Sequence, residues 1–188
     1  MAGWATPSPV GEVPASLACV RDFVNTTDRE TETDDIATPA DLAAYLHASG
    51  RLSPAQEATE SDLELALRLR RGLRRSLELN HDDVRSALPE LDAVLRELPL
   101  RLSWSDAEPR LAPLGSGVAG ALADIVVAAA AAIADGTWRR LKICAADDCA
   151  WAYYDASKNR ARNWCEYGCG NRIKVRAYRE RRRATSTG

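Results

Sequence analysis

The sequence predicts an α+β, mostly helical protein, in which an N-terminal helical domain with a β-hairpin precedes a small C-terminal module. Three observations support this fold class. Apolar residues recur at helical spacing through much of the chain, two short segments near the middle are typical of a hairpin, and four of the five cysteines cluster between residues 144 and 169. With 188 residues, 46% of them hydrophobic, the chain is long enough to bury one core and carry a satellite module.

Five helices are expected in the N-terminal domain, which we place at residues 15–137 after a loose lead-in, residues 1–14. Two of them begin at a Ser or Thr followed by Pro, a pair that suits a helix N-cap and first turn. The expected helices cover residues 15–25, Thr38 to about Gly50, a longer span that opens at Ser53-Pro54 and contains Leu65, Leu69, Leu73 and Leu77, then 83–97 and 115–134. The segments 98–104 and 110–114 predict the hairpin. The alanine-rich helix 115–134 is expected at the centre of the domain, because its small side chains allow close packing.

The longest apolar stretch, residues 118–134, contains Asp124 and falls short of the roughly 20 residues that a membrane span requires. Residues 1–11 lack the basic start and apolar run of a secretory signal. We therefore expect a soluble, cytoplasmic protein without membrane association. The chain also offers no Ser/His/Asp set and no phosphate-binding loop, and it has two histidines, so we do not expect an enzyme.

Four cysteines, Cys144, Cys149, Cys165 and Cys169, form the pattern C-x4-C-x15-C-x3-C. Two thiol pairs on short turns, joined by a longer connection, suit a tetrahedral zinc site, and four thiolates leave no open position for a catalytic water. The spacing predicts a structural four-cysteine zinc finger over residues 138–188, which is too short to fold without its metal. Two alternatives stay open: four unrelated core cysteines, or an iron–sulfur cluster. Cys19, far upstream, is interpreted as a small buried hydrophobe.

The C-terminal module is strongly basic, although the whole chain has a formal net charge of −2. Residues 139–183 hold thirteen Lys and Arg against five Asp and Glu, whereas the rest of the chain holds twelve against twenty-two. The segment that follows Cys169 predicts a basic helix, one face of which suits the phosphates of a nucleic acid. The candidate nucleic-acid contacts are Arg172, Arg176, Arg179 and Arg183 on that face, Lys174 elsewhere on the helix, Lys158, Arg160 and Arg162 in the central loop, and Asn171.

The same residues allow plainer interpretations. The arginines also suit a solvated surface or ion pairs with the acidic N-terminal domain. Asn171 also suits a helix cap or a structural role beside the zinc turn. A second basic run, residues 68–75, favours a salt-bridged surface helix. Its alternative is a small-anion pocket in a sensor domain, with Asp22, Asn25 and Arg71 as candidate lining residues and Asp22 or Asn25 expected to be buried.

Several of these motifs also resemble a known family. The segments 144–149, 151–155, 157–160 and 164–165, together with Cys169-Gly170-Asn171-Arg172, are similar to the CGNR zinc finger, which is named after those last four residues. The three residues between the last two cysteines are one fewer than in many members. Segments 22–26, 38–42 and 66–71 resemble the ABATE domain that usually precedes this finger. The resemblance implies a bacterial, stress-linked transcription regulator whose finger binds DNA.

Our leading hypothesis is therefore a zinc-dependent, DNA-binding transcription regulator whose N-terminal domain senses a small molecule or a protein partner. The alternative is a zinc-stabilised adaptor that binds RNA or protein without sequence-specific recognition of DNA.

Overall fold

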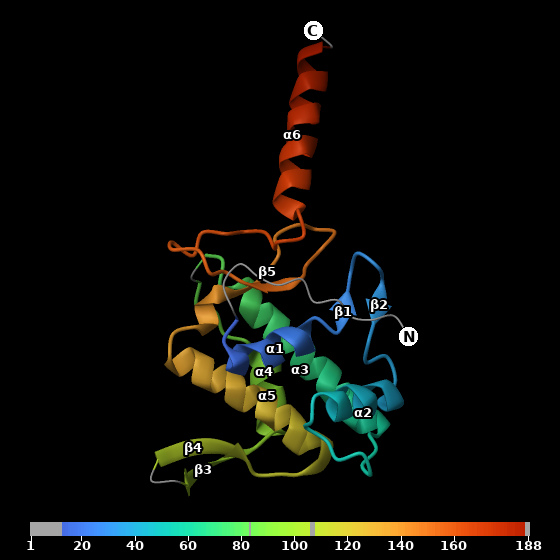
Figure 1. The fold of residues 1–188 in the computed structure, drawn as a ribbon, viewed down its shortest axis with the longest axis vertical. Coiled ribbons are helices and arrows are strands. Elements are labelled where there is room, and N and C mark those ends of the chain that lie inside the picture. The colour runs from blue at the N-terminus through green and yellow to red at the C-terminus, as the bar shows by residue number, and fades with distance from the viewer. Residues whose placement is uncertain (1–12, 83, 106–107, 187–188) are drawn as a thin grey trace.

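The computed structural model describes residues 13–82, 84–105 and 108–186, so the lead-in predicted over residues 1–14 lies outside the described residues except for its last two. The helices are α1 (Ala15–Val24), α2 (Pro39–Ala48), α3 (Glu60–Glu78), α4 (Pro89–Arg96), α5 (Gly117–Ala134) and α6 (Cys169–Ser186), with a short 3-10 helix, η1 (Trp138–Arg140). The strands are β1 (Thr27–Asp28), β2 (Thr33–Asp34), β3 (Leu100–Ser105), β4 (Glu108–Pro113), β5 (Leu141–Ile143) and β6 (Ala152–Tyr154). They form three antiparallel pairs, β1–β2, β3–β4 and β5–β6. The α+β, mostly helical fold class is confirmed (Figure 1).

The start of each helix depends on the residue that caps it. Helix α2 begins where the sequence predicts, because the side chains of Thr38 and Asp41 each accept a hydrogen bond from the other residue's backbone N–H. The prediction that the next helix opens at Ser53-Pro54 is wrong. Residues 53–56 form a turn instead, and Thr59 with Asp62 makes the capping box that starts α3.

The predicted start at residue 83 is also wrong, because α4 begins at Pro89. Proline suits the first helical position, where its missing N–H would have no partner within the helix. The other predicted elements correspond to α1, α5 and the β3–β4 hairpin, with ends that shift by a few residues.

Helix α5 lies at the centre of the N-terminal domain, where it packs against α1, α2 and α3. Its buried side chains include Val118, Leu122 and Ile125, which contact the aliphatic side chains of α1 and α3 in one core. Among the described residues, α5 alone is long and apolar enough to cross a membrane by the criteria of length and composition. In this fold it is a core helix.

The C-terminal module is docked onto the N-terminal domain through its first strands. Leu141 and Ile143 of β5 and Ala152 of β6 belong to the same hydrophobic core as α5. The buried side chain of Asn25 donates to the carbonyl of Ala152 at 2.9 Å and accepts from its N–H at 2.8 Å. Asn25 therefore acts like an added residue of the β-sheet edge and joins the end of α1 to β6.

Side chains on and after α3 add further bonds between the two parts. Arg74 donates to the Ala150 carbonyl at 2.5 Å, and Asn80 donates to the Leu141 carbonyl at 2.8 Å. The ring of His81 is hydrogen-bonded to another β5 carbonyl. By contrast, α6 extends away from the rest of the molecule (Figure 1).

Candidate metal centre and nucleic-acid interface

The first two cysteines lie in the turn that joins β5 to β6. Cys144 directly follows β5, and its backbone N–H donates to the Trp151 carbonyl at 2.8 Å, which extends the strand pairing by one step. The N–H of Cys149 donates to the Ala146 carbonyl at 3.0 Å and closes a tight turn. The hairpin thereby fixes both thiols close to the end of one short sheet.

The other two cysteines flank the turn that starts α6. Gly168 has a φ of +80°, in the left-handed region that favours glycine, and its carbonyl accepts the N–H of Arg172 at 3.0 Å. Cys169 is thus the first residue of α6. A Cβ on Gly170 would lie 3.1 Å from the ring of Trp164, so the absence of a side chain lets the helix rest closely on this indole.

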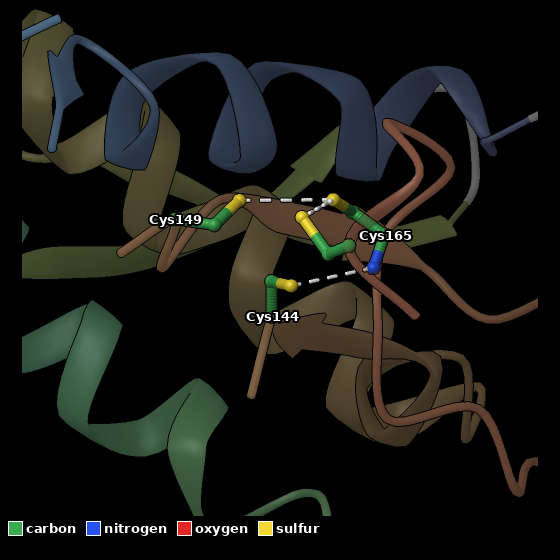
Figure 2. A group of neighbouring side chains, drawn as sticks. Cys144, Cys149 and Cys165 are labelled. Carbon is green, nitrogen blue, oxygen red and sulfur yellow. Dashed lines mark hydrogen bonds between the residues drawn. The ribbon is translucent and has the colours of Figure 1, made fainter. Parts of the chain in front are cut away.

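The four sulfur atoms all lie within 4.8 Å of one another (Figure 2). The separation is 3.7 Å between the Sγ atoms of Cys149 and Cys165 and 3.6 Å between those of Cys165 and Cys169. A zinc–sulfur bond of about 2.3 Å gives a regular tetrahedron with edges of about 3.8 Å. The observed spacing therefore fits one tetrahedral ion, is too long for disulfides, and leaves no room for the several atoms of an iron–sulfur cluster.

Hydrogen bonds among the buried cysteines shift the pKa values of three of the thiols. Hydrogen bonds from Cys149 and Cys165 lower the pKa of Cys144. The hydrogen bond to Cys144 raises the pKa of Cys149, and hydrogen bonds to Cys144 and Cys149 raise the pKa of Cys165, because each of these thiols is held in the protonated, donating form. A bound divalent cation supplies the positive charge that lets all four act as thiolates.

Arg172 links this centre to the N-terminal domain. Its guanidinium donates to Sγ of Cys169 at 3.1 Å and to the carboxylate of Glu30 at 2.7 Å, with Asp148 at 3.9 Å. Glu30 lies in the loop between β1 and β2. The hydrogen bonds to Glu30 and then to Cys169 raise the pKa of Arg172, which stays cationic and offsets the negative charge of the thiolates. Arg172 was predicted to contact a nucleic acid, yet in this structure it is paired within the chain.

A buried ion pair organises the loop between the two cysteine pairs. Nζ of Lys142 lies 3.1 Å from the carboxylate of Asp155, and both side chains are at most 2% exposed. Lys142 also donates to the carbonyls of Arg160 and Arg162, while Asp155 accepts from the N–H of Arg162 and from Ser157. Burial acts to raise the pKa of Asp155, but the hydrogen bonds from Ser157 and Lys142 outweigh it and lower that pKa.

The comparisons with known proteins match both parts of the chain. The model of the CGNR zinc finger matches residues 140–182, and the ABATE model, described as "Putative stress-induced transcription regulator", matches residues 17–136. The second match covers more than half of the chain. The chain belongs to the ABATE family. No curated protein matches it.

The CGNR finger of this ABATE protein is a zinc site. Cys144, Cys149, Cys165 and Cys169 hold the ion, as the spacing of the cysteines predicts. Four cysteine thiolates would fill the four positions of a tetrahedral ion, so a bound zinc would act to hold the finger together. The geometry also explains three letters of the family motif: Cys169 is a ligand, Gly170 makes room for Trp164, and Arg172 bonds to a ligand sulfur and to Glu30.

Helix α6 carries most of the residues predicted to contact a nucleic acid. Its 18 residues span about 27 Å at 1.5 Å per residue. Lys174, Arg176 and Arg179 are exposed and have no hydrogen bond or ion pair with any other described residue. The side chain of Asn171 is likewise exposed and does not cap a helix in the part of the chain that the structure describes. The side chain of Arg183 lies outside the described residues.

The three basic residues of the central loop differ in their surroundings. Lys158 and Arg160 are exposed. Arg162 is half-buried, with its guanidinium 5.8 Å from the ring centroid of Tyr153 and 3.7 Å from the carboxylate of Glu166. Of these three basic residues, Lys158 and Arg160 are thus the two whose side chains face solvent.

The predicted anion pocket of the ABATE domain does not assemble among the described residues. Asn25 is buried as expected, but the backbone of Ala152 occupies both polar atoms of its side chain. Asp22 is exposed and pairs with Arg21, which contradicts its expected burial, and Arg71 is also exposed.

The basic run on α3 is only partly the salt-bridged surface that the sequence favours. Arg68 pairs with Glu97 on the surface, but Arg70 is buried and donates to both carboxylate oxygens of Asp34 and to the hydroxyl of Thr26. The burial of Arg70 was not predicted from the sequence. A usable signal was present, because Arg70 occupies a position in the apolar helical stripe of Leu63, Ala66, Leu73 and Leu77.

Proposed function

We propose that this protein is a DNA-binding transcription regulator in which the zinc ion holds α6 in a position to meet duplex DNA. One observation carries the proposal: a helix about 27 Å long leaves the body with three exposed, cationic side chains, Lys174, Arg176 and Arg179, that have no partner among the described residues. Each such side chain suits a backbone phosphate. The description of the family as a transcription regulator agrees with this role.

The ABATE domain is, in this proposal, the regulatory part that receives a small molecule or a protein partner. The contacts that support a link between the two parts are specific: Glu30 bonds to Arg172, and Asn25 and Arg74 bond to the backbone of the finger. A change in the β1–β2 loop would therefore reach the base of α6 directly. We assign the protein no catalytic reaction and place it in the cytoplasm, where DNA-binding regulators of bacteria act.

The salt dependence of DNA binding tests the proposal. Each phosphate contact contributes about −0.9 to the slope of log affinity against log salt concentration. The double variant Arg179→Ala/Arg183→Ala should flatten this slope by about two units and weaken binding to all duplex sequences alike. Zinc content should stay at that of the wild type, since neither residue lies near the cysteines.

A matched control removes two exposed arginines from the ABATE domain. Arg75 and Arg96 have side chains that are 64% and 71% exposed, and each pairs with an acidic residue of its own helix. Arg75→Ala/Arg96→Ala changes the net charge equally and should leave the slope unchanged. If the intact protein binds no duplex DNA at low salt but binds single-stranded RNA or an acidic protein, the adaptor hypothesis replaces this proposal.

A further inference from the structure

The side chains of α6 are arranged in distinct strips around its axis. At 100° per residue, Arg172, Arg176 and Arg179 form one basic strip, on the face that position 183 shares, and Lys174 with Arg181 forms a second basic strip about 180° away. One of the two arcs between them holds Asn171, Val175, Tyr178 and Arg182, which we call the central strip. It covers about 60° of the helix circumference and has a basic strip on each side.

The central strip exposes apolar side chains that the chain itself does not cover. Val175 and Tyr178 are 41% and 55% exposed, on a helix otherwise dominated by charge. The guanidinium of Arg182 lies 6.0 Å from the ring centroid of Tyr178, so the two side chains form one surface. The opposite arc is the one that anchors the helix, because Ile173 packs against the cluster of zinc-binding cysteines.

Charge complementarity determines which partner fits this face. A second copy of α6 would bring two pairs of basic strips into contact, and the repulsion opposes pairing of the helices. The major groove of B-form DNA is about 12 Å wide and admits a helix about 10–12 Å in diameter, with a row of phosphates along each edge. The major groove of duplex RNA is too narrow for a helix. A central strip between two cationic flanks matches duplex DNA.

An acidic surface at the base of α6 indicates which turns of the helix contact DNA. Glu30 and Asp148 are more than half exposed beside Arg172. Their negative charge repels phosphates near the first turn of the helix. The DNA therefore meets the outer turns, where Val175, Tyr178 and Arg182 lie.

We infer that the outer residues of the central strip read base edges in the major groove, while the basic residues beyond Arg172 in the two flanking strips contact the phosphates of opposite strands. This inference rests on the proposed function, in which α6 binds DNA. Val175 and Tyr178 suit the methyl group of thymine, and Arg182 suits the acceptor edge of guanine. Asn171 lies in the first turn, beside the acidic surface, and is not one of the base-reading residues. The residues that determine sequence specificity are thus distinct from the two basic strips, which supply affinity.

The experiment uses the zinc-loaded full-length protein. A preferred duplex is selected from a random library, and affinities for it and for a scrambled duplex of equal composition are measured at one salt concentration. The variant Val175→Ala/Tyr178→Ala should lower the preference for the selected duplex by about tenfold or more, with unchanged affinity for the scrambled duplex and an unchanged salt slope. Alanine keeps the helix intact because its helix propensity exceeds that of valine and tyrosine.

Two further variants complete the comparison. Lys174→Ala/Arg181→Ala should weaken binding to both duplexes alike and flatten the salt slope, and Ala177→Ser on the anchoring arc should change neither quantity. Three results would overturn the inference while leaving the proposed function in place: selection that yields no preferred sequence, an unchanged preference in Val175→Ala/Tyr178→Ala, or equal affinity for duplex RNA. Absence of any DNA binding by the wild type would instead remove the proposed function itself.

Discussion

The two parts of this chain are stabilised by different interactions. The N-terminal domain buries aliphatic side chains of α1, α3 and α5 in one core, whereas the buried cluster of the finger consists of the four cysteines with Ala146 and Tyr153. Aliphatic burial stabilises a fold in water without any added component. A cluster of thiols stabilises a fold only with its ion. The N-terminal domain thus folds without a metal ion, whereas the finger, which carries α6, needs its ion to fold.

Loss of zinc should have the largest effect and should separate the two parts. Zinc binding contributes about 10–16 kcal/mol in small structural sites at neutral pH, so Cys165→Ser should release the ion and unfold residues 144–186. Because Leu141 and Ile143 pack in the N-terminal core, we expect the break near Cys144 and not at residue 138, where the sequence places the boundary. Metal analysis measures the release of zinc, and hydrogen exchange shows which residues unfold.

Cys19→Ser is the matched control for this experiment. The Cys19 thiol lies in α1, outside the cluster, and donates to the carbonyl of Ser16 at 3.1 Å. This variant should retain one zinc per chain. Full zinc stoichiometry in Cys165→Ser, or simultaneous loss of both parts, would show that the comparison between them is wrong.

Breaking the buried ion pair of the finger should have an intermediate effect. Asp155→Asn leaves Lys142 buried and unpaired, which costs about 3–5 kcal/mol, and the loss should be confined to the finger. Leu69→Ala should lower the free energy of unfolding by about 2–5 kcal/mol through the cavity that it creates. This loss should fall on the N-terminal domain. Hydrogen exchange in urea distinguishes the two sites of damage.

A double variant sharpens this test. Lys142→Met/Asp155→Asn removes the unpaired charge and should recover part of the stability that Asp155→Asn loses. If the double variant is no more stable than the single one, the hydrogen bonds of the carboxylate, and not the ion pair, hold the central loop.

The smallest effect concerns acid sensitivity of the N-terminal domain. Hydrogen bonds from Arg70 lower the pKa of Asp34 in the folded state. A lowered carboxyl pKa stabilises the fold above the unfolded pKa of about 3.9, and this contribution disappears as pH falls through the folded pKa. The difference in unfolding free energy between the parent and Asp34→Asn should be largest near neutral pH and should shrink below about pH 4.

Urea titrations at several pH values measure this difference, in a Cys165→Ser background so that zinc release does not contribute. Asp22→Asn is the control, because Asp22 is 54% exposed and its surface ion pair contributes little. A difference that grows in acid would contradict the assignment of Asp34 as the partner of Arg70.

Sequence signals predicted features that depend on neighbours in the chain. The cysteine spacing predicted the zinc site, because ligand pairs on short turns are local. Thr38-Pro39 predicted the start of α2, but the equivalent signal at Ser53-Pro54 was misleading, since Thr59 and Asp62 form a capping box nearby. Competing local signals can be ranked only when the whole chain has folded.

Features that depend on distant residues were not predictable in this way. Lys142 and Asp155 meet because β5 and β6 pair, and neither residue was assigned a structural role from the sequence. The bond between Glu30 and Arg172 joins residues 142 positions apart. It shows that the interpretation of these arginines as partners of the acidic domain holds for Arg172, at the base of α6, while Lys174, Arg176 and Arg179 further out keep no such partner among the described residues.

The anchoring contacts of α6 described above lie in its first five residues, at Cys169, Gly170, Arg172 and Ile173. The helix can therefore be treated as a rigid rod that pivots at its base, beside the zinc-binding cysteines. A rotation of about 10° at that pivot displaces a tip about 27 Å away by about 5 Å. The step between base pairs is about 3.4 Å. A rotation of that size, imposed through the Glu30 loop, would move the backbone at Arg182, about 20 Å from the pivot, by about 3.4 Å, which is one base step.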